Sequence, residues 1–246
     1  EAEWLAFETP FADRAALGDL GVATFIAQTL AGVGRIERTR LHDYVVKAMR
    51  EAAQHTRWTD PDEQFEAKVQ TAIDVAFDDP TVSAAWTVLL AVLERPGWSN
   101  SLGRKLVQMT MPGVPDTFQG AERWEMALVD PDNRRPVDYQ LRRHVSSVQP
   151  PPIDPTGAAK QWIVARTLGA RKTRPNAFAG YQPVAASGGM AEHMMGFDRG
   201  GAITIATRLP LRLARAGGWA ATTCTLPAGD WTEQFTGRRH AGVVPL

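Results

Sequence analysis

The residues best suited to chemistry lie between Met111 and Tyr139. This stretch reads MPGVPDTFQGAERWEMALVDPDNRRPVDY, and its second half crowds carboxylates and guanidinium groups together. Sugar transfer or hydrolysis needs one carboxyl group as acid and base and a second that attacks or stabilises the anomeric carbon, about 5–10 Å away. Glu122, Asp130 and Asp132 are the carboxylates eligible for these roles.

Two arginines accompany these carboxylates. Arg134 and Arg135 could hold sugar hydroxyl groups, or orient a carboxylate through forked hydrogen bonds. A second interpretation stays open, because DPDN is a favourable turn sequence and an Asp and Arg cluster often only locks a loop. The residue types therefore nominate a carbohydrate site without excluding a structural turn.

Other kinds of site find less support in the sequence. The five histidines are not spaced as metal ligands and there is one cysteine, so we expect no metal site. There is no GxSxG elbow, no Walker-type loop and no dinucleotide fingerprint after a strand. Trp58, beside His55 and Arg57, could stack on a sugar or could pin a helix corner.

Composition narrows the class of partner. The 246 residues carry 27 basic and 27 acidic side chains, so no excess charge points to nucleic acid or to an anionic membrane. No apolar run reaches the roughly 18–20 residues of a membrane span, and the first residues lack signal-peptide features. With Cys224 as its single cysteine, the sequence predicts a cytoplasmic protein with a neutral or small polar partner. Because it begins without Met, we expect part of a longer protein.

The elements before Met111 are predicted to be helices. Helical spacing of apolar residues extends over 19–34 and 38–55. Asp60 is the predicted N-cap of the next helix. A further helix should begin at Pro80 and end at Pro96, with a last one capped by Ser99 or Asn100.

The elements after Met111 are shorter. Residues 114–118 predict a strand that must belong to a larger sheet, since a strand this short cannot stand alone. A helix follows over 158–172, with Ala165 and Leu168 among its inward residues. After Pro175, short segments separated by Gly, Pro and Asp are typical of an antiparallel sandwich, with a hairpin turn at 199–201.

Several of these segments resemble one family. PGVPDTFQGAE resembles the turn, eighth barrel strand and following loop of the α-amylase superfamily, and VDPDNRRPVDY resembles the signature of its maltooligosyl trehalose synthase family. Residues 40–66 resemble the helical insertion of that family, AAKQWIVARTLGARKTRP its last barrel helix, and LPAGDWTEQFTGRR its C-terminal sandwich. The resemblance covers nearly the whole chain in the same order.

The resemblance implies an α+β fragment. Residues 1–110 would be the helical insertion of the catalytic region, and residues 111–174 the end of a (β/α)8 barrel with its eighth strand, loop and last helix. Residues 175–246 would be an antiparallel β-sandwich domain. The missing N-terminal part of the barrel would then be a partner of this chain.

The resemblance also implies a reaction. The family converts the reducing-end α-1,4 linkage of a maltooligosaccharide into an α,α-1,1 linkage, by retaining intramolecular transfer and without a cofactor. The superfamily's catalytic carboxylates follow barrel strands four, five and seven, upstream of these motifs, so we expect no catalytic residue in this chain. Alternatives are a non-catalytic carbohydrate-binding or assembly module, or a hydrolase or glucanotransferase of the same superfamily.

The sequence departs from the family pattern at Phe118, Ala121 and Arg123. The resemblance assigns a binding or bracing role to seven other residues. We expect the seven to shape the substrate site or to brace it without reacting. They are Gln119, Glu122, Asp130, Asp132, Asn133, Arg134 and Arg135.

Overall fold

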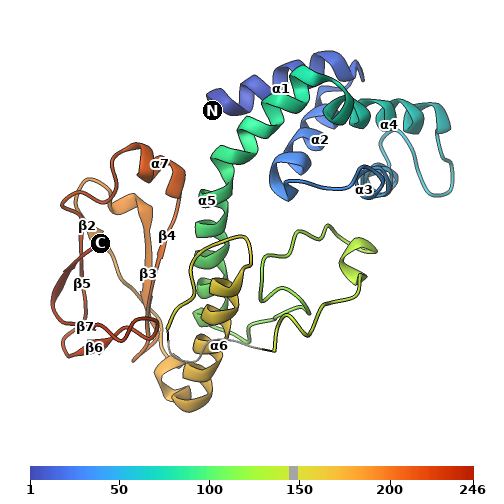
Figure 1. The fold of residues 1–246 in the computed structure, drawn as a ribbon. Coiled ribbons are helices and arrows are strands. Elements are labelled where there is room, and N and C mark those ends of the chain that lie inside the picture. The colour runs from blue at the N-terminus through green and yellow to red at the C-terminus, as the bar shows by residue number, and fades with distance from the viewer. Residues whose placement is uncertain (144–148) are drawn as a thin grey trace. The chain divides into compact units, whose positions relative to one another are not determined.

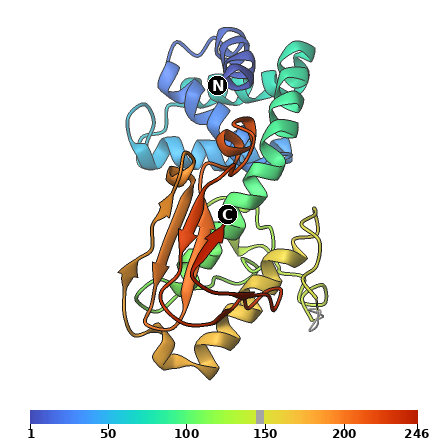
Figure 2. The ribbon, with the colours of Figure 1, turned by 90° about the vertical axis from the view of Figure 1, so that its left-hand side faces the viewer.

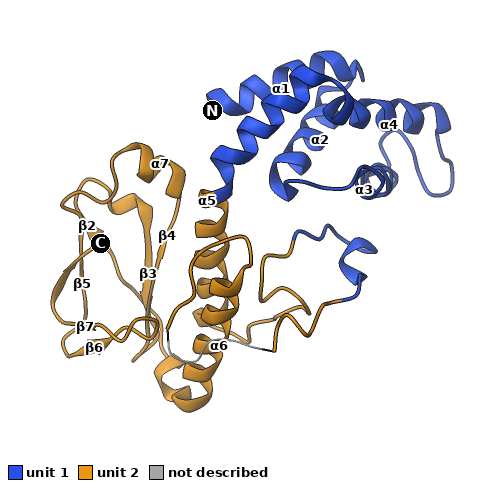
Figure 3. Ribbon diagram, viewed as in Figure 1, with its two compact units in different colours: residues 1–94, 126–136 blue, residues 95–125, 137–246 orange. Residues whose placement is uncertain are grey.

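The chain forms two compact units. A computed structural model describes residues 1–143 and 149–246. The first unit comprises residues 1–94 and 126–136, and the second comprises 95–125 and 137–246 (Figure 3). These units are defined by their compactness. The sequence-based division into residues 1–110, 111–174 and 175–246 refers instead to parts of a longer enzyme, and it stays a prediction.

The first unit is a helical assembly around one apolar core (Figure 1). Phe7, Phe11, Ile26 and Leu30 are fully buried in it, and the indole nitrogen of Trp86 donates to the Leu30 carbonyl at 3.2 Å. The helices are α1 (Ala2–Ala15), α2 (Leu20–Val33), α3 (Arg38–Ala52), α4 (Glu63–Asp78) and the first part of α5 (Pro80–Thr110).

Three predicted helix boundaries are wrong: the start of α4, the end expected at Pro96 and the start expected at Ser99 or Asn100. Asp62, not Asp60, caps α4, because its carboxylate accepts from the amide of Phe65 at 2.9 Å. Pro96 does not end a helix, since α5 continues through it to Thr110. A proline removes one amide donor and crowds the preceding turn, but helix-forming residues on both sides let the helix resume.

The second unit joins the rest of α5 and helix α6 (Ala158–Thr173) to small antiparallel sheets. In α6 the predicted inward residues Ala165 and Leu168 are exposed, whereas Val164 and Thr167 are buried. The apolar spacing identified this helix, but its packing partners selected a neighbouring face.

The sheets are antiparallel throughout, and α7 (Pro210–Arg215) lies at one end of their strands (Figure 2). Their orders are β1-β3-β4, β2-β5-β8 and β6-β7. The strands are β1 (Gln182–Pro183), β2 (Ala186–Ser187), β3 (Met194–Asp198), β4 (Ile203–Thr207), β5 (Thr223–Thr225), β6 (Trp231–Thr232), β7 (Arg239–His240) and β8 (Val243–Pro245).

One apolar cluster joins the two three-stranded sheets. Met194 of β3 and Cys224 of β5 are buried in it, and burial raises the pKa of the Cys224 thiol. The predicted hairpin turn at 199–201 connects β3 to β4, where Gly200 and Gly201 adopt positive φ. Short 3-10 turns complete the chain at η1 (Asp132–Arg134), η2 (Pro175–Phe178) and η3 (Ala191–His193).

The strand predicted at 114–118 is not formed. The backbone there carries no sheet pairing among the described residues, and the side chain of Val114 is 97% exposed. A strand needs a neighbour to receive its amide and carbonyl hydrogen bonds. This segment has none within the described ranges.

No single helix in the described parts of the chain is long and apolar enough to cross a membrane. Helices α4 and α5 meet that test only when they are taken together across a bend of 72°.

Candidate functional site

The candidate segment starts from an anchored helix end. At the C-terminus of α5, Arg199 donates to the carbonyl of Thr110 at 2.5 Å. Arg171 of α6 donates to the carbonyls of Met109 at 3.0 Å and Gly113 at 3.1 Å. The last carbonyls of a helix lack partners within the helix and carry partial negative charge, so guanidinium groups stabilise them. These contacts position the start of the segment.

Gln119 and Glu122 lie in the second unit, after the unpaired segment. Glu122 forms an ion pair with Arg142, with 2.5 Å between Oε1 and Nε, and both side chains are largely buried. The amide oxygen of Gln119 accepts from the hydroxyl of Tyr139 at 3.3 Å. Gln119 and Glu122 therefore hold the turn at residues 139–142 in place.

Arg123 supplies the central brace of this part of the chain. It is 7% exposed, and its Nε donates to the amide oxygen of Gln161 on α6 at 2.7 Å. Its other nitrogens donate to the carbonyls of Thr156 at 3.1 Å and Leu141 at 2.8 Å. The family departure at this position therefore has a structural use, which sequence reasoning missed because the partners lie 18 or more residues away.

The DPDNRR loop belongs to the first unit, where Asp132 is its anchor. Asp132 accepts a forked pair of hydrogen bonds from Arg40 of α3, with both distances 2.9 Å. It also accepts from the amide of Leu128 at 2.7 Å, and Arg135 lies 3.2 Å from it. The hydrogen bonds from Arg40 are the main cause that holds the pKa of Asp132 below its ordinary value. Burial raises this pKa, and the hydrogen bond from the Leu128 amide lowers it further.

The other loop residues are more open. Asp130 contacts Arg134 at 3.3 Å and lies 3.8 Å from Lys47 of α3. Arg134 is 71% exposed along its side chain, so its guanidinium is accessible from solvent. Asn133 is half-buried, and its amide oxygen has no hydrogen-bond partner within the described residues.

Every carboxylate nominated from the sequence is thus paired with an arginine. For Asp132 the pairing with Arg40 lowers the pKa and favours the charged form, which opposes proton donation as a general acid. Glu122 and Asp132 hold the chain in place through arginine partners, whereas the side chain of Arg134 is mostly exposed. The arrangement suits binding and bracing.

The structure separates the seven predicted residues into two groups. Residues 130–135 lie in the first unit, and Gln119 and Glu122 lie in the second. Arg40 and Arg142, the partners that hold the carboxylates, were missed. Arg142 is 20 residues from Glu122 in the chain and Arg40 is 92 residues from Asp132, so no local pattern links either pair.

A desolvated lysine also escaped the sequence analysis. Burial, and next the charge of Lys105, lower the pKa of Lys160 to about 8. Its ammonium lies 6.0 Å from the ring centre of Trp124, which stacks in parallel on Trp98. Within the described residues, no group of three or more His, Cys, Asp or Glu side chains could hold a metal ion.

The fold and the arginine-braced loop define an α+β protein with a helical unit and a unit of small antiparallel sheets. No protein-family model matches the chain. A Mycobacterium tuberculosis H37Rv protein, provisionally named maltooligosyl trehalose synthase, is 41% identical in a 238-residue alignment that covers 92% of this chain. The chain spans only 30% of that relative's length.

Solved structures agree with this relationship. The maltooligosyltrehalose synthase of Arthrobacter ramosus is 42% identical, with a TM-score of 0.92 over 98% of this chain and 32% of its own. A hypothetical maltooligosyl trehalose synthase of Sulfolobus tokodaii, 24% identical with a TM-score of 0.78, shares the fold. Over nearly its whole length the chain is similar to maltooligosyl trehalose synthases, which confirms the resemblance found in its motifs.

Proposed function

We propose that the chain is the C-terminal part of a glucan 1-α-D-glucosylmutase. The complete enzyme would convert the reducing-end α-1,4 linkage of a maltooligosaccharide into an α,α-1,1 linkage by retaining intramolecular transglycosylation. The bond to O4 of the last glucose would break and a bond to its O1 would form, without release of glucose. The 42% identity to the Arthrobacter ramosus synthase over 98% of the chain carries this proposal.

In this proposal the DPDNRR loop borders the substrate while other parts of the enzyme supply the catalytic carboxylates. Asp130, Asn133 and Arg134 would face the sugar, and Asp132 would hold the loop through Arg40. The forked hydrogen bonds at 2.9 Å and the lowered pKa of Asp132 support the bracing role. Gln119 and Glu122 would brace the chain at 139–142 within the second unit.

The rest of a (β/α)8 barrel would be the partner of residues 111–174. The exposed apolar side chains of Val114 and Phe118 support this, because burial against neighbouring strands would remove them from water. We further propose a cytoplasmic enzyme that needs no cofactor and has no nucleic-acid or membrane partner.

Substitution of Arg134 in the complete enzyme tests the site. Because a charged hydrogen bond contributes about 1.5–3 kcal/mol, Arg134→Ala should lower turnover about tenfold or more and raise the ratio of hydrolysis to isomerisation. Arg238→Ala, at another exposed arginine, is the matched control. Unchanged turnover and an unchanged product ratio in Arg134→Ala would remove Arg134 from the site.

A second candidate function is a carbohydrate-binding or assembly module without catalysis. It is favoured by the pairing of Glu122, Asp130 and Asp132 with arginines. Residues 1–246 alone should then leave the reducing power of maltopentaose unchanged. Conversion of maltopentaose to a non-reducing product by this chain alone would contradict both the module and the absence of catalytic residues. Release of glucose would instead indicate a hydrolase or glucanotransferase.

A further inference from the structure

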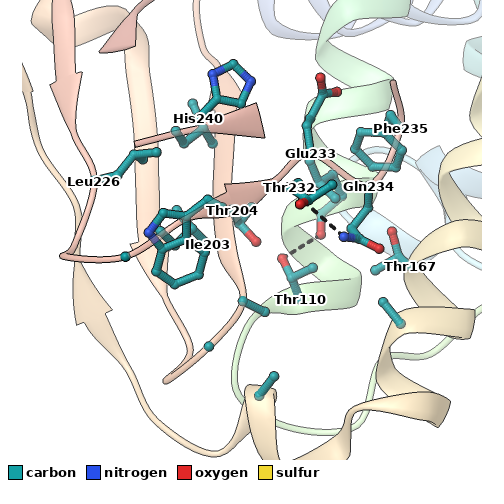
Figure 4. Close-up of a pocket in the computed structure, with 18 of the residues that line it drawn as sticks. Thr110, Thr167, Ile203, Thr204, Leu226, Thr232, Glu233, Gln234, Phe235 and His240 are labelled. Carbon is teal, nitrogen blue, oxygen red and sulfur yellow. Dashed lines mark hydrogen bonds between the residues drawn. The ribbon is translucent and has the colours of Figure 1, made fainter. Parts of the chain in front are cut away.

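The second unit contains a cavity of about 900 Å³ that shares no residue with the candidate site (Figure 4). Its wall is formed by the end of α5, by α6, by β4 and by the segment around β6. Exposed Arg174 and Asp230 belong to its lining, so it can be reached from solvent. This volume is near the upper end of the roughly 300–1,000 Å³ typical of small-molecule sites.

Three threonines with little exposed surface line the cavity. Thr110, Thr167 and Thr204 are 5%, 5% and 3% exposed, although threonine is mostly a surface residue. Thr110 donates to the Leu106 carbonyl, but the side chains of Thr167 and Thr204 form no hydrogen bond with another described residue. Thr167 and Thr204 therefore offer hydroxyl groups to a polar molecule in the cavity.

The cavity also contains an oriented aromatic side chain. The indole of Trp231 packs against the apolar cluster of the sheets, and its Nε1 donates to the carbonyl of Pro227 at 2.9 Å. Gln234 projects into the same space and is held by a hydrogen bond of 3.0 Å to the Thr232 carbonyl (Figure 4). A fixed indole beside hydroxyl and amide groups suits a molecule with an apolar face and polar edges.

The arginines and carboxylates of the lining balance one another in number. Arg166 and Arg174 are balanced by Asp230 and Glu233. Arg166 also stacks on Trp162, with 4.5 Å between the guanidinium carbon and the ring centre. A neutral ligand with many hydroxyl groups therefore fits the lining better than a phosphate or a carboxylate.

We infer that this cavity binds a short neutral α-glucan. One pyranose ring of the sugar would stack on Trp231, and its hydroxyl groups would form hydrogen bonds with the side chains of Thr167, Thr204 and Gln234. The choice of α-glucan among neutral sugars rests on the proposed function. The site would hold the substrate chain or its product through a part of the protein that takes no part in bond breaking.

Titration calorimetry of the 246-residue chain with maltotriose tests this inference. Wild type should show saturable binding, and cellotriose should bind more weakly. Thr167→Val and Gln234→Ala should each weaken maltotriose binding about 3- to 10-fold, as expected for one lost hydrogen bond. Trp231→Ala should weaken it about tenfold or more. Thr71→Val, at an exposed threonine of α4, is the matched control and should change nothing.

Because Trp231 also contacts the apolar cluster, Thr167→Val and Gln234→Ala decide the outcome if Trp231→Ala fails to fold. Absence of saturable maltotriose binding, or equal binding by all variants, would overturn the site and would indicate that the cavity holds water only. Mutase activity of the complete enzyme is measured separately. Binding without mutase activity would refute the proposed function alone, and activity without binding would refute the cavity site alone.

Discussion

The ion pair between Arg40 and Asp132 gives the sharpest prediction. Arg40→Met keeps most of the length and apolar character of the side chain but removes the guanidinium group. The substitution leaves the carboxylate of Asp132, which is 12% exposed, with the Leu128 amide and the more exposed Arg135. We expect the loop at 126–136 to open more often.

The expected magnitude follows from burial. Removing one partner of a fully buried ion pair costs about 3–5 kcal/mol, whereas an exposed pair contributes about 0–1 kcal/mol. The side chains of Arg40 and Asp132 are 21% and 12% exposed, which places this pair between those limits. We therefore expect Arg40→Met to lower the local free energy of opening by about 2 kcal/mol.

Hydrogen exchange of the Leu128 amide measures this opening directly, because that amide donates to Asp132. A double-mutant cycle with Asp132→Asn gives the coupling energy of the pair. Arg38→Met, on the same helix but outside the loop contact, should leave Leu128 exchange unchanged. A coupling energy below about 0.5 kcal/mol would refute the bracing role, because that is the value of an ordinary surface pair.

The same pair predicts a pH dependence. Because Arg40 lowers the folded-state pKa of Asp132, its stabilisation is complete above the unfolded pKa of about 3.9 and is lost as the pH falls through the folded pKa. In Arg40→Met the main cause of the lowered pKa is absent. The acid dependence of Leu128 exchange should then shrink, and an unchanged dependence would contradict the assignment.

Three further predictions concern the second unit. Arg199→Met should destabilise the chain by roughly 2–4 kcal/mol, because the Thr110 carbonyl it serves belongs to a buried residue, and thermal unfolding measures this. Gly157→Ala should also destabilise the chain, because φ is +69° and a Cβ would lie 2.6 Å from the Trp124 amide nitrogen. Gly169 lies in α6 with open space around its Cβ position, so Gly169→Ala should stabilise the chain by about 0.5–1 kcal/mol. For Lys160, a folded pKa of about 8 below the unfolded pKa means that the unfolded state binds more protons. Stability should therefore rise with pH from about 8 towards 10, and Lys160→Met should abolish that rise in denaturation measured across this range.

The sequence predicted the elements whose signals are local. Helices such as α3 and α6 follow from apolar spacing, and the hairpin turn at 199–201 follows from its two glycines. The predicted cap of α4 lies two residues before the observed one. Asp60 and Asp62 have the same side chain, and only the path of the backbone selects between them. Pro96 misled because a proline costs a helix one hydrogen bond without forbidding its continuation.

The candidate site shows the same division. Residue types alone located the acidic and basic loop at 130–135, and the motifs around it indicated the family. Only the tertiary structure showed that Asp132 is bound by Arg40, 92 residues away, and that Arg123 ties the chain to α6. Periodicity carries information about neighbours one turn or one strand apart, whereas such pairings depend on how distant elements pack. The sequence by itself therefore located the charged loop and indicated the family, and the packing decided which charges hold the chain and which face solvent.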